Sequence, residues 1–352
     1  MSGADVLVVG AGPVGLTAAL ALIRGGLRVD LVEARPALGS DSLAATFHPP
    51  TLQILADLGV DLRGCGLEAR TISFRASGEG VPTRLHLTEL AAETPHPYRL
   101  HLPQLSVCRA ILERLDGSNL CRISFNERVT ALRTRDYQWV FAADGSESSL
   151  RKAAQVGFTG QSYAGTVVRL ICDPMGFEDW DPVTYVAAQT ESVSVLRMVD
   201  HIRVIVRAAG ATADILATAS RTATRVTGVA PVVREWSPYR SRRMLISANL
   251  VGNLIFVGDS AHLTTTRGGM NMNAGIHDAA VIAAALARDD SSVVDAAARR
   301  LAVARDMLLP RTHETLGDPM ARLEQIRALN NDTRERREFL RRGAMLDMVT
   351  WP

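Results

Sequence analysis

A glycine-rich hexapeptide near the start of the chain, Gly10-Ala11-Gly12-Pro13-Val14-Gly15, has the spacing that binds the pyrophosphate of a dinucleotide. The first glycine permits a tight turn, the second lets the pyrophosphate reach the backbone, and the third lets a helix pack closely on a strand. Glu33 follows about 20 residues later, at the spacing at which an acid binds ribose hydroxyls. The pattern predicts a dinucleotide site without distinguishing NAD from FAD.

A second group of residues, in the last third of the chain, could bind a flavin. Gly258-Asp259-Ser260-Ala261-His262 directly follows the apolar run Leu254 to Val257, and Gly268-Gly269 and Asn273 come shortly after. A carboxylate at a strand end can accept hydrogen bonds from the ribityl chain. A helix starting near Asn273 would place the positive end of its dipole beside the flavin N1–C2=O edge. A Gly-Asp pair alone most often marks an ordinary turn.

The elements that position these motifs alternate between strands and helices. The predicted strands cover residues 5–9, 29–32, 123–132, 139–142 and 254–257, and the predicted helices cover residues 14–24, 49–58 and 104–115. Between Val167 and Arg207 apolar and polar residues alternate, which predicts a half-exposed antiparallel sheet. After Ala274 the chain is predicted to be helical and to be divided by Pro310 and Pro319.

Composition excludes several other classes of protein. The chain has 352 residues, 47% hydrophobic and 22% charged, and its formal net charge of +2 gives no pull toward nucleic acid or acidic membranes. Lys152 is the only lysine, so the sequence has no Gly-Lys-Ser/Thr phosphate loop. The four cysteines lie far apart, and no metal site is predicted. The uncharged run Val6 to Ile23 follows Asp5 and contains glycines, so we interpret it as strand, turn and helix and expect a soluble, cytoplasmic protein.

A third motif reads Ala143-Asp144-Gly145-Ser146-Glu147-Ser148-Ser149-Leu150-Arg151, with Gly157 and Gly160 after it. Taken in order along the chain, the three motifs resemble those of the class A FAD-dependent monooxygenases, aromatic hydroxylases of the para-hydroxybenzoate hydroxylase type. The resemblance covers residues 4–285, and residues 334–345 also resemble the family's C-terminal part.

The resemblance implies an α/β fold with three parts. A Rossmann-like FAD-binding domain would comprise residues 1–70, 100–165 and 245–290. An inserted antiparallel β-sheet substrate domain would comprise residues 71–99 and 166–244. Residues 291–352 would form a helical C-terminal segment.

The resemblance also implies FAD-binding roles for residues at matching positions. The candidates are Gly10, Gly12, Pro13, Val14, Gly15, Glu33, Arg35, Gln104, Arg109, Asp144, Asp259, Gly269, Met272 and Asn273. The glycine-rich turn would hold the pyrophosphate and Glu33 the ribose, while Gln104 and Asp259 would lie at the ribityl chain. The family links the residue at Asp144 to both FAD and the pyridine nucleotide. The backbone N–H groups of Met272 and Asn273 would face the flavin N1–C2=O edge.

Four features depart from the family's pattern. Leu43 stands where many members have an arginine, and Arg35 could supply the lost contact. Thr264-Thr265-Thr266 replaces one or two prolines beside the flavin ring. Asn271 stands at a usual glycine, and asparagine is the non-glycine residue that best tolerates a left-handed backbone. The stretch 132–139 is short for the hairpin we expect there.

Histidines and aromatic residues supply the remaining candidates. His48 lies in a segment that the family places near the isoalloxazine, where it could relay a proton or simply hydrogen-bond a loop. We interpret His262 and His277 as structural, and Arg334 to Arg342 as a solvated helix face. Residues in segments expected to wall the substrate cavity, each more often ordinary sheet surface than a contact, are Tyr98, His101, Tyr185, Arg197, His201 and Tyr239.

The function implied by the resemblance is an NADPH- or NADH-dependent FAD monooxygenase. In the family mechanism the nicotinamide reduces the flavin, a flavin C4a-hydroperoxide forms, and one oxygen atom passes to an electron-rich ring. The expected partners are dioxygen and a small phenolic or polycyclic aromatic substrate of secondary metabolism. Neither nucleic acid nor membrane is expected, and the protein would be a monomer or homodimer.

Two alternatives stay open. The same fold with FAD could serve an oxidase, a dehydrogenase or a Baeyer-Villiger-type oxygenase, which the threonines at the flavin face would suit. The chain could instead be a catalytically degraded flavin-binding accessory protein, which Leu43, Thr266 and Asn271 favour. A halogenase is disfavoured because the tryptophans are isolated, and no Gly-x-Ser-x-Gly or His-Glu-x-x-His motif supports a hydrolase.

Overall fold

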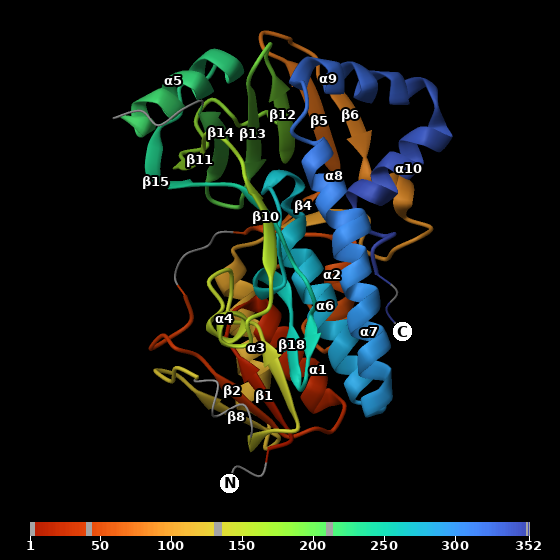
Figure 1. Ribbon diagram of the computed structural model, residues 1–352. Helices are drawn as coiled ribbons and strands as arrows, with labels where there is room; N and C mark the ends of the chain where they lie inside the picture. The colour runs from red at the N-terminus through yellow and green to blue at the C-terminus, as the bar shows by residue number, and fades with distance from the viewer. Residues whose placement is uncertain (1–3, 40–43, 130–135, 209–213, 350, 352) are drawn as a thin grey trace.

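Two large β-sheets and the helices that cover them make up most of the protein. The computed structural model describes residues 4–39, 44–129, 136–208, 214–349 and 351, so Leu43 and half of the short stretch 132–139 lie outside the described residues. In Figure 1 a six-stranded sheet occupies the lower half of the molecule and a seven-stranded sheet the upper half. The expected α/β fold, with an inserted sheet and a helical C-terminal part, is confirmed.

The six-stranded sheet is built around strand β1. Its strands, in spatial order, are β17 (Leu250–Val251), β18 (Leu254–Phe256), β9 (Trp139–Ala142), β1 (Val6–Val9), β2 (Val29–Val32) and β8 (Cys121–Ser124). All neighbours pair in parallel except β17 with β18. Every residue of β1 and β2 is buried, which explains their nearly unbroken apolar sequence. Because the strands are parallel, the carboxyl ends of β1, β2, β8, β9 and β18 meet at one edge.

Helix α1 (Pro13–Arg24) follows β1 after a turn that leaves almost no room for side chains. Gly10 has a φ of 106°, and a Cβ there would lie 2.4 Å from the carbonyl oxygen of Ala143, just after β9. A Cβ on Gly15 would lie 1.9 Å from the carbonyl oxygen of Gly10. Both positions require glycine because the helix and the two strand ends approach backbone to backbone.

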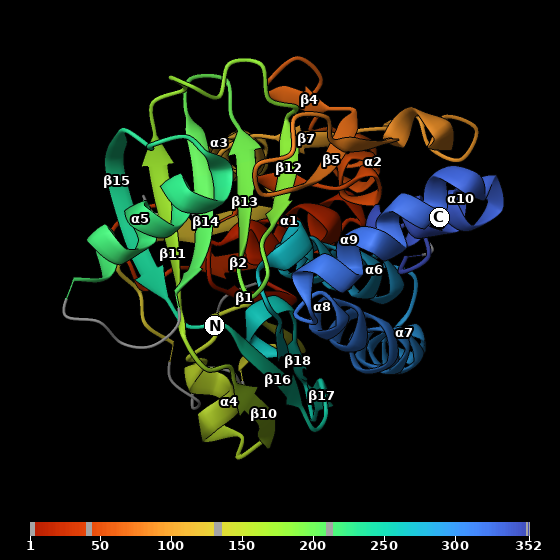
Figure 2. The same cartoon turned by 90° about the horizontal axis from the view of Figure 1, so that it is seen from above.

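Helix α6 (Met270–Leu286) lies at the centre of the helical layer. It packs against α1, α2 (Pro49–Asp57) and α7 (Asp290–Val303), while α3 (Gln104–Asp116) packs against α1. Seen from above, α6 and α7 lie on the opposite flank from β11 and β15 (Figure 2). Most residues of α6 are buried, and its many alanines allow neighbouring helices to come close. The helix begins three residues before Asn273, the start expected from the sequence.

The seven-stranded sheet has the order β15 (Val233–Tyr239), β11 (Thr166–Cys172), β14 (Ile202–Ala208), β13 (Ser192–Arg197), β12 (Val183–Ala187), β5 (Thr71–Ala76) and β6 (Thr83–His86). The sheet is mixed rather than wholly antiparallel, because β5 comes from an earlier part of the chain and pairs in parallel with β12. On β14 the side chains of Ile202, Val204 and Val206 pack into a core with helix α5 (Ile215–Thr227). The side chains of Arg203, Ile205 and Arg207 therefore point to the other face.

Smaller elements connect the two large sheets. One three-stranded sheet has the order β3 (Thr46–Phe47), β7 (Arg99–His101) and β4 (Leu67–Ala69). A second has the order β10 (Phe158–Ser162), β16 (Arg242–Ile246) and β19 (His262–Leu263). The short helix α4 (Ser149–Ala153) comes before β10 in the chain. The strands of the six-stranded and seven-stranded sheets come from different stretches of the chain. The domain boundaries given above stay a proposal.

The C-terminal part is helical, as predicted, but Pro310 does not divide it. Helix α7 runs through a π-helical turn, η5 (Ala304–Leu308), directly into α8 (Leu309–Glu314). Pro310 stands in the first turn of α8, where the π turn before it accommodates a residue without an N–H. The break comes at Pro319, which starts α9 (Pro319–Ala328) behind a cap from Asp318; α10 (Thr333–Gly343) follows.

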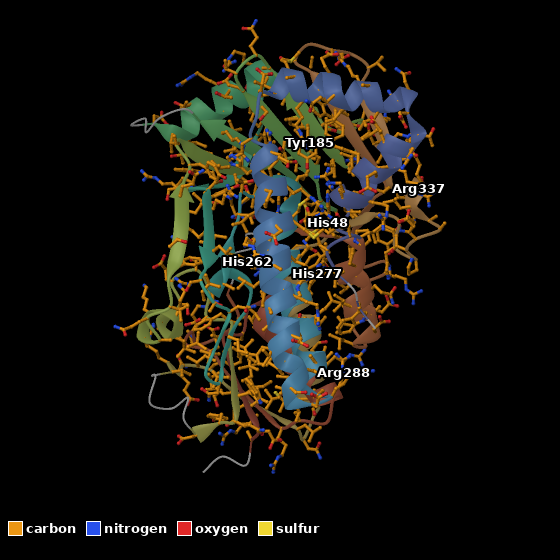
Figure 3. All side chains as sticks on the ribbon, turned by 45° about the vertical axis from the view of Figure 1, so that its right-hand side comes forward. His48, Tyr185, His262, His277, Arg288 and Arg337 are labelled. Atoms are coloured by element: carbon orange, nitrogen blue, oxygen red, sulfur yellow. The ribbon has the colours of Figure 1, made fainter. Side chains whose placement is uncertain are left out.

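Helix α10 uses its arginines for ion pairs rather than presenting all of them to solvent. Arg336 pairs with Glu89, and Arg337 and Arg341 both pair with Glu93. Figure 3 labels Arg337 on this flank of the molecule. The interpretation of residues 334–342 as a solvated face agrees with the exposure of Arg337 and Arg341, whose side chains are 45% and 38% exposed, but these arginines also pair with an acid from a segment distant in sequence.

A buried ion pair fastens the C-terminal part to the core. Arg300 of α7 donates to Asp278 of α6 at 2.7 Å and to the carbonyl oxygen of Met348. Both charged side chains are about 5% exposed, so their attraction is weakly screened. None of the helices in the described part of the chain is long and apolar enough to cross a membrane.

Replacing Arg300 with methionine should destabilise the fold by about 3 to 5 kcal/mol, because the substitution leaves the Asp278 charge buried without its main partner. Urea unfolding of the purified protein measures the change. The exposed neighbour Arg299 gives the matched control, Arg299→Met, which should leave the free energy of unfolding within about 0.5 kcal/mol of the wild-type value. Similar losses in the two variants would show that the buried pair does not hold the C-terminal part.

Candidate functional site

A large cavity of about 780 Å³ lies between the carboxyl edge of the six-stranded sheet and the inner face of the seven-stranded sheet. Loops after β1, β2, β9 and β18 line one side, and strands β11 to β15 line the other. Ligands of open parallel sheets bind outside the carboxyl ends of the strands, so this is the expected place for a nucleotide.

The glycine-rich turn leaves its second glycine open to the cavity. A Cβ on Gly12 would meet no atom within 4 Å, although Gly12 lines the cavity, whereas Gly10 and Gly15 are enclosed by backbone. Gly12 also stands immediately before α1, where backbone N–H groups lack helical partners. The turn can therefore receive a pyrophosphate at Gly12 while the other two glycines serve the packing.

Glu33 stands at the end of β2 and lines the cavity. Its carboxylate accepts hydrogen bonds from the N–H of Ala11 at 2.8 Å and from the N–H and Nε of Arg35 at 3.0 Å. Burial alone would raise the pKa of Glu33, but these hydrogen bonds outweigh burial and lower it. The side chain is therefore an anion held beside the glycine-rich turn, with acceptor capacity left for ribose hydroxyls.

Asp144 and Arg151, at the two ends of the third motif, hold the strand-end loops together. Asp144 Oδ2 accepts from the N–H groups of Ser149 and Leu150, while its Oδ1 is buried with no hydrogen-bond partner among the described residues. Arg151 donates to the carbonyl oxygens of Ser146 and Ser260, both at 2.8 Å. The third motif thus supports the Gly258–Ser260 turn, and Asp144 lines the cavity.

Asp259 is connected to the buried ion pair through two intermediate side chains. Asn271 Nδ2 donates to Asp259 Oδ1 at 2.7 Å, and Asn271 Oδ1 accepts from His262 Nδ1 at 3.1 Å. His262 Nε2 donates to Asp278 Oδ2 at 2.7 Å. Burial alone would lower the pKa of His262, but Asp278 and Asn271 outweigh it and raise it, so both ring nitrogens carry protons. The imidazolium therefore fixes which end of the Asn271 amide faces Asp259.

Asn271 does not adopt the left-handed backbone anticipated for it. It lies in the first turn of α6, and the left-handed residues are Gly268, with a φ of 83°, and Gly269, with a φ of 65°. The two glycines before the helix already make the turn, so position 271 is free to carry a side chain. That side chain supplies a hydrogen bond to Asp259 that glycine could not make.

A second buried network fixes the start of α6. Asn273 Oδ1 accepts from Thr51 Oγ1 at 2.7 Å and from the N–H of His48 at 3.0 Å, and its Nδ2 donates to the carbonyl oxygens of Thr46 and Gly269. His277 Nε2 donates to Thr51 Oγ1 at 2.8 Å. Figure 3 shows His48 and His277 close together on this side of α6. The interpretation of His262 and His277 as structural agrees with these contacts.

The structure brings most of the predicted cofactor-binding residues into one cavity. Those that line it are Gly10, Gly12, Pro13, Val14, Glu33, Arg35, Gln104, Asp144, Asp259, Gly269 and Met272. Gly15 and Asn273 lie behind the lining, and Arg109 is on the exposed side of α3. His48 is fully buried, and its Nε2 donates to the carbonyl oxygen of Gly268 at 2.8 Å. Their roles in FAD binding and catalysis stay predictions.

The threonine loop is anchored on both sides. Thr265 Oγ1 donates to the carbonyl oxygen of Thr312 in α8 at 3.2 Å, and Thr266 Oγ1 lies 2.9 Å from the hydroxyl of Tyr239 in β15. Thr264 and Thr266 line the cavity. Side-chain hydrogen bonds therefore fix the loop where relatives of this type use the rigid ring of proline.

On the substrate side, Tyr185 and Tyr239 line the cavity, while Tyr98, His101, Arg197 and His201 do not. Sequence analysis missed a group of arginines on this side: Arg99, Arg169, Arg203, Arg207 and Arg267. Two of them, Arg203 and Arg207, stand at alternate positions of one strand, which is the signal that could have placed them on a single face.

The residues present fit FAD. Gly12 leaves space beside the first turn of α1, and Glu33 keeps acceptor capacity next to it. Asp144 offers a buried oxygen without a partner, and Asp259 keeps a second carboxylate oxygen besides the one that Asn271 binds. A dinucleotide and a ribityl chain require this set of open backbone and acceptors.

Comparison with known proteins agrees with this geometry. Residues 3–307 match the model of a family described as an FAD binding domain. The chain belongs to this family. Para-nitrophenol 4-monooxygenase of Pseudomonas sp. (strain WBC-3) is 26% identical over 318 residues, which are 80% of this chain and 77% of that protein. Pentachlorophenol 4-monooxygenase of Sphingobium chlorophenolicum is 23% identical over 308 residues, which are 78% of this chain and 56% of that protein.

A solved structure extends the comparison to the whole chain. The crystal structure of p-nitrophenol 4-monooxygenase PnpA from Pseudomonas putida DLL-E4 has a TM-score of 0.84 at 22% identity and covers 96% of each chain. The prediction of a class A FAD-dependent monooxygenase is confirmed. The protein is an enzyme, an oxidoreductase of the FAD-dependent monooxygenase type, and FAD is its cofactor.

Gly12→Val should abolish FAD binding without unfolding the protein. A Cβ at this position meets no atom of the chain within 4 Å, so the valine side chain would project into the space that the pyrophosphate needs. The absorbance spectrum of the purified variant and its urea unfolding curve measure the two effects. Gly15→Ala is the control. Its Cβ would meet the Gly10 carbonyl oxygen, so this variant should lower the stability of the apoprotein, which Gly12→Val should not do. A yellow Gly12→Val protein with wild-type FAD affinity would sink the assignment.

Asp259→Ala should weaken FAD binding by about 1 to 3 kcal/mol, the worth of a hydrogen bond to a carboxylate. Asp278→Ala should weaken it much less and should instead lower stability, because Arg300 and His262 lose their shared partner. Titration of each apoprotein with FAD, together with thermal unfolding, separates the outcomes. Equal losses of FAD affinity in the two variants would mean that the ribityl chain lies elsewhere.

The lowered pKa values of three buried histidines, His48, His101 and His277, predict that stability falls as the pH drops below 6.5. Burial and the nearby guanidinium of Arg300 lower the pKa of His277 to about 3, and burial lowers that of His101 to about 4. The folded protein binds these protons less readily than the unfolded chain does. Their stabilisation is therefore complete above pH 6.5 and is lost below it, by about 1 kcal/mol per histidine and pH unit. His262, whose pKa is raised, acts in the opposite direction.

Urea unfolding at pH 7, 6 and 5 measures this dependence. His101→Gln, which keeps a donor for the carbonyl oxygen of Arg197, should remove about 1 kcal/mol per pH unit from the slope. The exposed His86 provides the control, and His86→Gln should leave the slope as it is. An unchanged slope in His101→Gln would contradict the expectation.

Proposed function

We propose that the protein is an NADPH- or NADH-dependent FAD monooxygenase that hydroxylates a small aromatic substrate. The observation that carries the proposal is the continuity of the cavity, which is lined both by the dinucleotide turn and by the inner face of the seven-stranded sheet. A flavin nucleotide bound at the dinucleotide turn would present its ring to the inner face of the seven-stranded sheet. The names of the relatives, nitrophenol and pentachlorophenol monooxygenases, support an aromatic substrate.

The substrate side of the cavity suits a flat ring. Tyr185 stacks on Phe74 with ring centroids 5.3 Å apart, and Leu196 and Ile205 add apolar surface from β13 and β14. Met270 and Met272, at the start of α6, line the cavity between the sheet and the glycine-rich turn. These side chains would bind and orient the ring and exclude water from it.

Bound FAD, once reduced by NADPH or NADH, supplies the activation of dioxygen and the oxygen transfer, by the route that the family resemblance implies. The contribution of this chain is to hold the ring at a fixed place. The glycines 268 and 269 are held by His48 and Asn273, and Asp259 is held by Asn271. The start of α6 offers backbone N–H groups and the positive end of its dipole to an electron-rich flavin edge.

His48 has two features relevant to proton transfer. Its Nε2–H is used by the Gly268 carbonyl oxygen, and its Nδ1 is buried with no partner among the described residues. Burial and the nearby Arg99 hold the pKa of His48 well below 6.5, so the ring is neutral and Nδ1 is an unused hydrogen-bond acceptor. A role for His48 in proton transfer stays part of the proposal, next to its positioning of Gly268.

The anchored threonine loop favours a working enzyme over a degraded accessory protein. Loss of the prolines is accompanied by hydrogen bonds from Thr265 to α8 and between Thr266 and Tyr239. Loss of glycine at position 271 is accompanied by the hydrogen bond to Asp259. Thr265, Thr266 and Asn271 thus make hydrogen bonds that hold the cavity loops in place, as a working site requires.

The reaction is tested with ¹⁸O-labelled dioxygen, FAD-loaded protein, NADPH or NADH, and a panel of phenols and polycyclic aromatics. We expect an aromatic ligand to accelerate oxidation of the nicotinamide and to leave carrying one labelled oxygen atom. Oxidation of the nicotinamide that gives only hydrogen peroxide across the panel would count against an aromatic hydroxylase. Turnover that needs no nicotinamide would instead favour an oxidase or a dehydrogenase.

A further inference from the structure

Charged side chains line the main cavity on both sides, and carboxylates come from one side only, where Arg35 and Arg128 lie beside them. Its carboxylates all come from loops at the edge of the six-stranded sheet: Glu33, Glu127, Asp144, Glu147 and Asp259. On the opposite side the charged residues are arginines of the seven-stranded sheet, of β7 and of the loop before α6. Of these, Arg207 of β14 and Arg267 before α6 are joined by Arg322 of α9, and we call these three the arginine cluster.

The arginine cluster has no carboxylate partner among the described residues. Arg267 donates to the hydroxyl of Ser192 and to the carbonyl oxygen of Thr315, both uncharged, and its Nε is buried without a partner. The side chains of Arg207 and Arg322 form no ion pair or hydrogen bond within the same part of the chain. Guanidinium groups in this setting are poised to bind an anion.

The positive charges of Arg207 and Arg322 act on Arg267. Burial first, and then Arg207 and Arg322, lower the pKa of Arg267 to about 10, and burial lowers the pKa of Arg207 and Arg322 as well. The carboxylate that acts on Arg322, Glu314, is exposed and lies 3.8 Å from Arg342. Like charges gathered away from water cost free energy, which a bound anion would relieve.

The cluster stands where the main cavity meets a smaller one. The smaller cavity, of about 90 Å³, lies beneath α9 and α10 and is lined mostly by apolar side chains such as Ile72, Leu323 and Phe339. Arg267 and Tyr185 line both cavities, Arg207 lines the main one and Arg322 the smaller one. Figure 3 shows Tyr185 above His48. An anion here would lie at the end of the substrate space remote from the glycine-rich turn.

We propose that the arginine cluster binds a carboxylate carried by the aromatic substrate, so that the substrate class is aromatic acids rather than neutral phenols. The planar forks of Arg207, Arg267 and Arg322 suit a planar carboxylate, and the ring of such an acid would lie against Tyr185 and Ile205 on the flavin side. The inference rests on the proposed function for the identity of the ring, but the charge preference itself is measured without turnover.

The test uses FAD-loaded protein with oxidised flavin and no nicotinamide. The probes are matched pairs, 4-hydroxybenzoate with 4-hydroxybenzamide and 6-hydroxy-2-naphthoate with its amide, titrated by calorimetry and by the change in flavin absorbance. We expect each acid to bind at least about 10-fold more tightly than its amide, the effect of one charged hydrogen bond.

Two variants locate the preference. Arg207→Met and Arg322→Met should each reduce it to about 3-fold or less, and neither leaves a buried partner unpaired. Arg267 is kept because its hydrogen bonds hold the loop before α6. Arg288→Met is the matched control: this exposed arginine lies just after α6, at the end remote from Tyr185 in Figure 3, and the variant should keep the full preference.

Equal affinity for acids and amides, failure of every acid to bind, or an unchanged preference in both cluster variants would overturn the proposal. A further experiment measures the binding of NADP⁺ to the same variants and its competition with the acids. If the cluster variants weaken NADP⁺ binding and leave the binding of acids unchanged, the arginines serve the nucleotide and the proposal is wrong. If the protein prefers acids but transfers no labelled oxygen, only the proposed function is contradicted. If it hydroxylates neutral phenols and shows no preference for a charged ligand, only this inference is contradicted.

Discussion

The approach of backbone to backbone at Gly10 and Gly15 is the constraint on which the nucleotide half of the molecule depends. The carbonyl oxygens of Ala143 and Gly10 occupy the places where Cβ atoms would be, so β1, β9 and α1 come as close as main chains can. That closeness aligns the carboxyl ends of β1, β9 and β18 at one edge, where the loops carrying Asp144 and Asp259 begin. Asp144 and Asp259, the acceptors proposed for a flavin nucleotide, lie close together because β1, β9 and β18 cannot move apart.

Buried polar side chains do the remaining positioning. One chain of contacts leads from Asp259 through Asn271 and His262 to Asp278 and Arg300, and so to the carbonyl oxygen of Met348. The other, centred on Asn273, joins α2, β3 and the two glycines before α6. Paired buried polar groups make such networks rigid, and in the second network only Nδ1 of His48 and Nδ1 of His277 have no partner among the described residues. They couple the geometry of the cavity to the helices of the C-terminal part, far along the chain.

The two sides of the cavity differ in chemistry because they come from different sheets. The parallel sheet contributes strand-end loops with glycines and acids, which suit the phosphates and hydroxyls of a nucleotide. The seven-stranded sheet is covered on its outer face by α5, so alternate side chains of β14 are free to line the cavity, and these are arginines and an isoleucine. Specificity for the cofactor and specificity for the substrate can therefore change independently in this fold.

The sequence by itself determined the nucleotide half. Gly10, Gly12, Gly15 and Glu33 are local in sequence, and their spacing follows from one strand, one turn and one helix, so the pattern could be recognised without a structure. The family resemblance added Asp144 and Asp259, whose motifs are equally local. Only the tertiary structure decided the rest. Arg207, Arg267 and Arg322 come from a strand, a loop and a helix far apart in sequence. No sequence pattern around any one of them predicts that the other two lie near it. The partners of Asn271 and Asn273, and the ion pairs of α10, were likewise out of reach of sequence reasoning, because a buried polar side chain is explained by what surrounds it, and packing alone brings those surroundings together.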